Sequence, residues 1–373
     1  MTADSIRKKV LFVLPALTAG GAERVLITLM NGVDRNKFDP LFLTVINKGE
    51  LRDIIDPQIP FHTLNAKSVF CCLIKLYKFI KYHDPDTIVS TMAHMNFALL
   101  FLKPFLSEKK VIVREAITPS FFFQKYKKSA FAIKLLYQFL YARANVVLSP
   151  SQIIFDEFRD LLRMSSNNFY LLPNPVNIEQ IKEMTFDQKI SKERKRTVHF
   201  LSAGRLGRQK GFDRLIEYLP QMEHKFDWKL TIIGEGSERT NLETLVKKHG
   251  FQDKIVLPGL VRPPWSHYME ADCFLMPSRF EGLPNVVLES LACGTPVIAT
   301  KESGGIQYIM DESPKGSVTV VNNMWDFLKE MEKVKPVPSR NQKKSLLNPL
   351  FTPPVVFKKF EEILLHEDEE APR

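Results

Sequence analysis

The chain has 373 residues, of which 45% are apolar and 25% are charged, a composition that excludes an intrinsically disordered protein. This length exceeds what one hydrophobic core usually supports, so we expect two domains. The formal net charge of +10 suits phosphate groups or an anionic membrane, and no apolar run reaches the roughly twenty residues of a membrane-spanning helix. The four cysteines show no CxxC spacing, so we expect neither a disulfide framework nor a zinc site.

Short β-rich runs alternate with longer helical patterns, which predicts parallel sheets covered by crossover helices. In the first half, the predicted strands are KKVLFVLPA, PLFLTVIN, DTIVSTM, KVIVREA and NVVLSPS. The first run follows basic residues, as in a secretory signal, but it is short and Pro15 interrupts it, so we predict a buried strand. Gly20 and Gly21 lie between this strand and a helix, where backbone N–H groups can approach a ligand closely.

His94 lies between the strand DTIVSTM and a helical run, at a position that can face a ligand, although a lone histidine is more often structural. Asp84 and Asp86 have the D-x-D spacing that some sugar transferases use for a metal. This pair precedes its strand instead of following it. We therefore predict no metal site.

Residues 101–143 contain nine Lys or Arg and only two acidic residues, Glu108 and Glu115. Within them, SFFFQKYKKSAFAIKLLYQFLYARA combines phenylalanines, lysines and an amphipathic helical pattern. The segment fits an interfacial element on an anionic membrane, or a helix that packs on a sheet with solvated lysines, and both interpretations stay open. Because no recognised nucleic-acid-binding module accompanies the charge, we expect no nucleic acid partner.

The second half repeats the pattern with VHFLSAG, KLTIIGEG, KIVLPG, CFLMPS, PVIAT and SVTVV. We infer an α/β protein with two doubly wound parallel-sheet domains, whose strands present their carboxyl ends to a shared central cleft. The predicted domains are residues 1–175 and 176–350, with a proline-rich, then charged boundary near 175–196. Residues 351–366 form a helix with an apolar stripe, and residues 367–373 form an acidic tail.

The segment EGLPNVVLESLACGT predicts a helix from about Pro284 to Ala292, since proline suits a first turn and Gly294 can end the helix. Its free N–H groups, near Asn285, Val286 and Val287, form a positive pole for an anion such as a diphosphate. Glu281 precedes this helix and Glu289 lies within it. Both can accept hydrogen bonds from ligand hydroxyls, or both are ordinary solvated charges.

The segment LSAGRLGRQKGFDRLIEYL carries Arg205 and Lys210 on a glycine-containing loop between a strand and a helix. These cations can neutralise a diphosphate, and the alternative is that they are ordinary surface charges. The glycines match neither a P-loop nor the dinucleotide fingerprint, which disfavours an NAD oxidoreductase.

Taken in order, the segments TAGGAERV, SPSQIIFDEF, NPV, AGRLGRQKGFDRLIEYL, LTIIGEGSERT and ADCFLMPSRFEGLPNVVLESLACGTPVIAT resemble the family-4 retaining glycosyltransferases of the GT-B fold. The resemblance covers most of the chain. It implies two Rossmann-like domains and a nucleoside diphosphate sugar donor, with UDP favoured, bound mainly by the C-terminal domain. Arg205 and Lys210 would then hold the diphosphate, Glu289 the ribose and Glu281 the donor sugar.

The same resemblance implies that Gly21 approaches the donor phosphate and that His94 contacts the donor sugar near the reacting carbon. Glu281, His94, Arg205 and Lys210 are thus the catalytic candidates. Leu260 to Arg262, centred on Val261, would lie beside the base. Further donor-binding candidates are Gly20, Gly234, Leu283, Pro284 and Asn285. The resemblance departs where Tyr308 stands in place of the usual acid, which affects the expected donor contacts of residues 303–310.

The family resemblance also implies catalysis without a metal or cofactor, because fixed cations and helix poles stabilise the departing diphosphate. Retention would follow a front-face substitution in which the leaving phosphate helps to take the acceptor's proton. Members with GGAERV starts commonly build polysaccharides or lipid-linked glycans. We therefore expect a lipid-linked glycan or lipopolysaccharide precursor as acceptor, and a cytoplasmic protein that is peripheral on the inner membrane. The alternatives are a sugar-nucleotide 2-epimerase and a non-catalytic sugar-nucleotide binder of the same fold.

Overall fold

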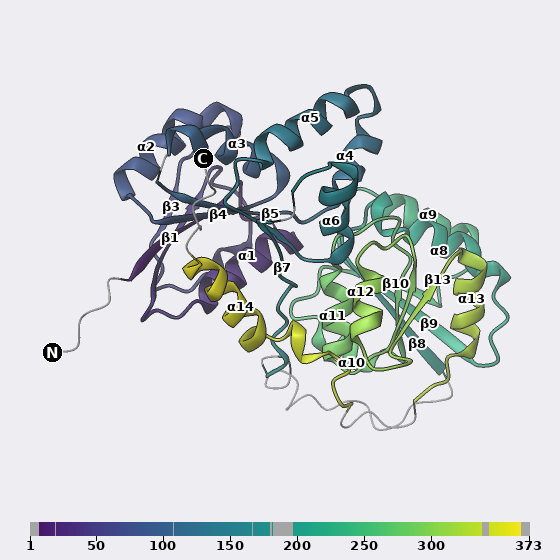
Figure 1. Ribbon diagram of the computed structural model, residues 1–373. Helices are drawn as coiled ribbons and strands as arrows, with labels where there is room; N and C mark the ends of the chain where they lie inside the picture. Colours follow the sequence, from purple (N-terminus) through teal and green to yellow (C-terminus); the bar gives the residue numbers. More distant parts are fainter. Residues whose placement is uncertain are drawn as a thin grey trace. The chain divides into compact units, whose positions relative to one another are not determined.

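A computed structural model describes residues 7–18, 20–106, 108–165, 167–179, 181, 197–337 and 343–366 (Figure 1). The chain divides into two compact units, Met1–Pro175 with Pro353–Arg373, and Val176–Thr352, called unit 1 and unit 2 below. Most of the predicted charged boundary and the whole predicted acidic tail lie outside the described residues. The roles assigned above to the two domains stay predictions.

Unit 1 contains a seven-stranded parallel sheet in the order β3-β2-β1-β4-β5-β6-β7. Its strands are β1 (Lys8–Leu14), β2 (Phe38–Thr44), β3 (Phe61–Thr63), β4 (Thr87–Thr91), β5 (Lys110–Arg114), β6 (Val146–Ser149) and β7 (Phe169–Leu171). All strands predicted for this half are present. Strands β3 and β7 were not predicted, because each is only three residues long and occupies an edge, where little apolar patterning is needed.

Helices cover both faces of this sheet. Val10 and Phe12 of β1 face a core shared with α1 (Gly21–Gly32) and α14 (Pro353–Leu365), whereas Leu11 and Val13 face the opposite core. The opposite face carries α2 (Leu73–His83), α3 (Ala93–Leu102), α5 (Ala130–Tyr141) and α6 (Gln152–Asp156), with α4 (Pro119–Lys125) preceding α5. Short helical turns connect these elements: η1 (Leu51–Ile54), η2 (Phe70–Cys72), η3 (Lys103–Phe105), η4 (Lys127–Ser129) and η5 (Glu157–Leu161).

Unit 2 contains a six-stranded parallel sheet in the order β10-β9-β8-β11-β12-β13. Its strands are β8 (Thr197–Ala203), β9 (Asp227–Ile233), β10 (Ile255–Gly259), β11 (Cys273–Met276), β12 (Val297–Thr300) and β13 (Val318–Val321). One face packs on α8 (Phe212–Tyr218), α9 (Arg239–Lys248) and α13 (Met324–Lys333); the other packs on α10 (Trp265–Glu270), α11 (Asn285–Ala292) and α12 (Ile306–Glu312). The helical turns are η6 (Arg208–Lys210), η7 (Leu219–Gln221) and η8 (Pro349–Phe351).

Both sheets are doubly wound, as the sequence analysis predicts. In each sheet the chain starts near the middle, adds two strands on one side, and returns to add the rest on the other side. The direction changes between β1 and β4 in unit 1 and between β8 and β11 in unit 2. Ligands of such sheets bind beyond the carboxyl ends of the strands at this switch point. The functional site is therefore expected in the loops that follow these four strands.

None of the helices in the described ranges combines the length and apolar character that crossing a bilayer requires.

Candidate active site

The loop after β8 crosses the loop after β9 so closely that only glycine fits at the crossing. Gly204 donates its N–H to the Ile233 carbonyl at 2.9 Å, and a Cβ on Gly234 would lie 1.9 Å from the Gly204 carbonyl oxygen. Gly234 also has a φ of +141°, a conformation that side-chain-bearing residues rarely adopt. The predicted donor-binding residue Gly234 therefore shapes the loop that carries Arg205 and Lys210.

The structure brings Lys210 and Glu281 together at the β8/β11 switch point. Lys210 lies in η6 and its Nζ is 2.7 Å from Oε1 of Glu281, which follows β11. Glu281 is 9% exposed and also accepts a hydrogen bond of 3.0 Å from the Ser278 hydroxyl. The pair therefore holds one positive and one negative charge, both largely buried, at the place where an open α/β sheet binds its ligand.

The loop that carries Glu281 is held from several sides. Arg214 of α8 donates to the carbonyls of Pro277 and Ser278, each at 2.9 Å, and the Thr300 hydroxyl donates to the Ser278 carbonyl at 2.8 Å. Gly304 approaches from the loop after β12, where a Cβ would lie 1.9 Å from the Glu281 carbonyl oxygen. These supports fix the direction of the Glu281 carboxylate. These supports were not predicted from the sequence, although the pair of glycines in TKESGGIQ was an available signal.

Helix α11 begins at Asn285 and ends at Ala292, and Gly294 follows with a φ of +73°. Pro284 precedes the helix instead of occupying its first turn, and its carbonyl accepts the Val287 N–H at 3.1 Å. That N–H, which the sequence analysis assigned to the positive pole, is thus already used. The predicted pole is therefore smaller by this N–H group.

The other candidates on this helix differ in exposure. Glu289 is half-buried and accepts a hydrogen bond of 3.2 Å from the Tyr268 hydroxyl of α10, which orients its carboxylate. Leu283 is 6% exposed and belongs to the core, so its side chain does not line an open surface.

Arg205 and Val261 lie in the loops after β8 and β10, the two strands on either side of β9 in unit 2. The Arg205 side chain is exposed, and no hydrogen bond or ion pair joins it to another residue that the structure describes. Val261 follows β10 and is partly buried against the core. Tyr308, where the family pattern has an acid, packs its ring against Phe351 with centroids 5.8 Å apart. The predicted contacts of these residues with a donor stay predictions.

In unit 1, the turn after β1 is built around a buried carboxylate. Gly20 caps α1 and Gly21 is its first residue. Glu23 is 3% exposed, accepts a hydrogen bond from the Thr18 hydroxyl, and folds back so that a Cβ on Gly20 would lie 2.2 Å from its Oε2. Glu23 was not among the residues predicted from the sequence. Its place three residues after the glycine cap was the available signal, since this helix position favours a carboxylate.

His94 lies in the first turn of α3, next to the β1/β4 switch point. Met92 caps this helix with a φ of +77°, which is strained for a residue with a side chain and is frequent at functional sites. Although His94 remains exposed, neighbouring protein atoms desolvate its imidazole and lower its pKa below 6.5, while the charge of Glu23 acts in the opposite direction. His94 is therefore largely neutral at neutral pH.

Both carboxylates of the D-x-D sequence, Asp84 and Asp86, interact with other residues of unit 1. Asp84 forms an ion pair of 2.6 Å with Lys109, and Asp86 accepts the Lys9 N–H at 2.7 Å. Across the ranges that the structure describes, no group of three or more His, Cys, Asp or Glu side chains could hold a metal ion.

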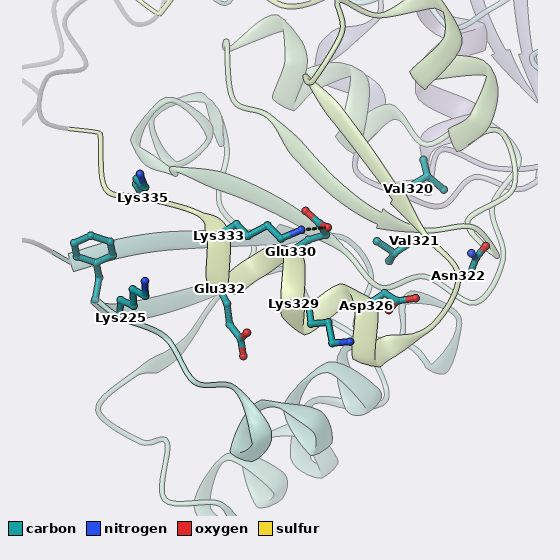
Figure 2. Close-up of a pocket in the computed structure, with 11 residues that line it drawn as sticks. Lys225, Val320, Val321, Asn322, Asp326, Lys329, Glu330, Glu332, Lys333 and Lys335 are labelled. Carbon is teal, nitrogen blue, oxygen red and sulfur yellow. Dashed lines mark hydrogen bonds and ion pairs between the residues drawn. The ribbon is translucent and has the colours of Figure 1, made fainter.

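A cavity of about 780 Å³ lies away from these residues, on the surface of unit 2 (Figure 2). Figure 2 shows that lysines and acids of α13 line it, and Lys333 and Glu330 form an ion pair of 2.6 Å across one turn of that helix. Its charges are mixed and largely exposed, unlike those of Lys210 and Glu281. The chemistry of the switch point, not the size of this groove, therefore selects the candidate site.

Comparison with known protein families identifies both halves of the chain. Residues 19–180 match the family model described as Glycosyltransferase Family 4, and residues 183–344 match the model described as Glycosyl transferases group 1. A similar curated protein is the Campylobacter jejuni "N-acetylgalactosamine-N,N'-diacetylbacillosaminyl-diphospho-undecaprenol 4-alpha-N-acetylgalactosaminyltransferase". It is 27% identical over 328 residues, which cover 85% of this chain and 88% of that protein.

Two solved structures share the fold. The lipopolysaccharide outer core galactosyltransferase WaaB has a TM-score of 0.68 and 18% identity, covering 95% of this chain and 99% of WaaB. Anabaena Alr3699/HepE, solved in complex with UDP-glucose, has a TM-score of 0.71 and 17% identity, covering 95% of this chain and 99% of HepE. With two doubly wound parallel sheets and two family models that together span most of its length, the chain belongs to the family-4 glycosyltransferases of the GT-B fold.

Proposed function

We propose that this glycosyltransferase moves a hexosyl or N-acetylhexosaminyl group from a UDP-sugar to a lipid-linked glycan or a lipopolysaccharide or polysaccharide precursor, with retention and without a metal. The observation that carries the proposal is the ion pair of Lys210 and Glu281 at the β8/β11 switch point. A site for a nucleoside diphosphate sugar needs a cation for the diphosphate and an acceptor for sugar hydroxyls. This pair supplies both within 2.7 Å.

The chemistry requires stabilisation of the negative charge that develops on the departing diphosphate. Lys210 and the exposed Arg205 provide fixed cations, and the first turn of α11 provides a positive pole. Glu281 accepts hydrogen bonds from hydroxyl groups of the donor sugar, and Glu289 accepts them from hydroxyl groups of the ribose. In the front-face substitution we propose, the acceptor oxygen bonds to the anomeric carbon as the bond to the diphosphate breaks, and a departing phosphate oxygen takes the acceptor's proton.

The acceptor class rests on the names of relatives. The Campylobacter jejuni relative named above acts on an undecaprenyl-diphosphate-linked glycan, and a second protein of that organism, 26% identical over 352 residues, is also named for a GalNAc-containing PP-undecaprenol acceptor. The UDP-glucose bound to Anabaena HepE favours a UDP-sugar donor. We place the reaction at the cytoplasmic face of the inner membrane, with residues 101–143 against anionic lipid.

The test measures donor turnover with and without an undecaprenyl-diphosphate-linked glycan. UDP-, GDP- and ADP-sugars are first screened by thermal shift, because a bound donor stabilises the folded protein. A transferase then releases nucleoside diphosphate in proportion to glycan extension. If the reaction needs no metal, this release continues in the presence of EDTA. NMR of the product reports the anomeric configuration. A 2-epimerase would form a new sugar nucleotide without acceptor, and a non-catalytic binder would form no product. Either result would contradict the proposal. Loss of turnover in EDTA would contradict the part that states that no metal is needed.

A further inference from the structure

One face of unit 1 is covered by α2 to α6, and the first four of these helices contain no acidic residue. Helices α2, α3, α4 and α5, with η2, η3 and η4 between them, contain no Asp or Glu. Leu76 of α2, Leu99 of α3 and Tyr137 of α5 pack into the same core, so these helices form one layer on the sheet (Figure 1). The helices on the opposite face, α1 and α14, carry charges of both signs: Glu23, Arg24, Lys358, Lys359, Glu361 and Glu362.

The outer surface of this acid-free layer exposes large apolar side chains. On α2, Ile74 is 73% exposed and Tyr82 is 85% exposed; on α5, Phe131 is 75% exposed and Phe139 is 63% exposed. Phe70, Phe101, Phe105, Tyr126, Leu135 and Leu136 add to them. In contrast, Trp325 is the only large apolar side chain that a described helix of unit 2 exposes to a similar degree. Clusters of this kind mark interaction surfaces rather than ordinary solvated helices.

Basic side chains surround the exposed apolar ones in two places. The α2 patch consists of Phe70, Ile74 and Tyr82 with the exposed Lys75, Lys78 and Lys81. The α5 patch consists of Tyr126, Phe131, Leu135, Leu136 and Phe139 with Lys125, Lys127, Lys128 and Arg143.

Cations also lie against aromatic rings in the α5 patch. The Arg143 guanidinium lies 4.2 Å from the Phe139 ring centroid, and the Lys125 ammonium lies 5.2 Å from that of Tyr126. Aromatic rings next to long basic side chains suit the boundary between lipid headgroups and acyl chains.

The nearest acids do not cancel this charge. Asp84 is neutralised by its ion pair with Lys109, and Asp86 and Glu108 lie beside the amino ends of β4 and β5, outside the layer. Glu115 follows the carboxyl end of β5, outside the four helices. On the same face, Asp156 and Asp160 of α6 and η5 form ion pairs with Arg159 at 3.0 and 2.7 Å, and Glu157 accepts the Ser120 N–H at 2.8 Å.

We propose that unit 1 docks on an anionic lipid bilayer through two separate patches of one helical layer, the α2 patch and the α5 patch. This inference rests on the proposed function and deepens it. It adds the α2 patch, which lies outside residues 101–143, as a second membrane contact. Each basic residue near an anionic membrane strengthens binding by about fivefold. Because both patches belong to one rigid layer, binding of one raises the effective concentration of the other at the surface.

The experiment is a vesicle flotation assay on the full chain without donor or acceptor. Vesicles contain phosphatidylglycerol with phosphatidylcholine, or phosphatidylcholine alone, at low and high salt. The α2 variant is Lys75→Glu/Lys78→Glu/Lys81→Glu, and an apolar variant is Ile74→Ser/Tyr82→Ser. The matched control is Lys358→Glu/Lys359→Glu, which makes the same kind of charge change on α14, on the opposite face of the sheet.

We expect binding to phosphatidylglycerol vesicles that high salt weakens, a loss of about tenfold or more in both α2-patch variants, and a change within about twofold in the control. All these positions are exposed except Lys359, which is half-buried, so circular dichroism and thermal unfolding should stay unchanged. Equal binding to neutral vesicles, or unchanged binding of the α2 variants, would overturn the proposal. So would self-association in sedimentation without vesicles that the α2 variants abolish, because the patch would then belong to a second copy of the chain. Since no sugar transfer is measured, a failure of the proposed reaction leaves this result unaffected.

Discussion

The two units differ in whether the charged side chains beyond the carboxyl ends of their strands form ion pairs. In unit 2 two ion pairs lie there: Lys210 with the buried Glu281, and the half-buried Arg279 with the half-buried Asp213, each at 2.7 Å. In unit 1, Glu23, Arg114 and Glu115 are each at least as buried as Glu281, and none forms an ion pair with another residue that the structure describes. Two sheets of the same winding thus place opposite electrostatic arrangements at equivalent edges.

The pKa values follow this difference. Burial pulls the pKa of Asp213 upward, but the hydrogen bonds and charge of Arg279 outweigh it, so the pKa lies below 3.8. Burial raises the pKa of Glu115 to about 7, because the hydrogen bond from the Tyr141 hydroxyl offsets only part of the cost. Burial likewise lowers the pKa of Arg114 to about 10, and its Nε and Nη1 have no hydrogen-bond partner among the described residues. The presence of a charged partner, and not burial alone, therefore decides whether the charged or the neutral form of a buried group is favoured.

The largest expected effect concerns the glycine crossing that supports the paired edge. Gly234→Ala should lower the free energy of unfolding of unit 2 by about 4 kcal/mol, because it combines a strained φ with a clash against backbone. Gly250→Ala is the control, since its φ of +71° is also positive but its Cβ would meet nothing within 4 Å, so about 1 kcal/mol is expected. All three tryptophans, Trp228, Trp265 and Trp325, lie in unit 2, so urea denaturation followed by tryptophan fluorescence reports on this unit. An equal loss in the free energy of unfolding for both variants would contradict the close approach of Gly234 to Gly204.

The unpaired edge of unit 1 should appear in the pH dependence of stability. A folded-state pKa raised from 4.5 to about 7 means that the Glu115 contribution is fully present below pH 4.5 and is lost as pH rises through about 7. The loss corresponds to about 3 kcal/mol.

Urea denaturation followed by circular dichroism between these pH values measures this slope, and tryptophan fluorescence separates the transition of unit 2. Glu115→Gln removes the titrating group and should flatten the slope. Because Arg114 loses its nearest opposite charge in this variant, the slope rather than the absolute stability is compared with that of the unchanged chain. An unchanged slope would show that another group titrates.

The paired edge of unit 2 should control turnover. Lys210→Ala or Glu281→Ala should each lower turnover by about a hundredfold, as expected for loss of one charge-stabilising contact at a reacting group. The double variant should lose little more than either single variant, because the two side chains act as one unit. The Arg279→Ala/Asp213→Ala double variant is a control that removes an ion pair of the same length from the same unit. Near-normal rates in the single variants, with folding preserved, would remove the Lys210 and Glu281 pair from the site.

The smallest effect concerns the imidazole of His94. Its pKa should lie below 6.5, and Glu23→Gln should lower it further, because the carboxylate that opposes the desolvation is lost. NMR titration of the histidine ring signals measures both values, with His94→Gln used to assign the signal. The other histidines, which lie outside this turn, should titrate unchanged. An upward shift of the His94 pKa in the Glu23 variant would contradict the arrangement at the β1/β4 switch point.

Much of the fold can be predicted from periodicity. The buried runs of β1, β8 and β11 are apolar and short, and the segments between them have helical spacing, which predicts parallel doubly wound sheets. Glycine and proline also mark helix α11 to within one residue at its start. The short edge strands β3 and β7 were missed because three-residue strands carry too little pattern.

The site was predictable only as a list of residue types. The sequence indicates that Lys210 and Glu281 each follow a strand, but they lie 71 positions apart, and their contact depends on β8 and β11 being neighbours in the sheet. Nothing local indicates that Arg114 reaches Asn174, 60 positions away.

The amino-acid sequence by itself determined the alternation of strands and helices, the glycine turns and the acid-free composition of α2 to α5, because these depend on neighbouring residues along the chain. Only the tertiary structure decided which charges are paired, which are buried alone, and which apolar side chains of α2 and α5 are left exposed. Those properties depend on strand order and on which face of each helix meets the sheet, and they arise from contacts between segments distant in the chain.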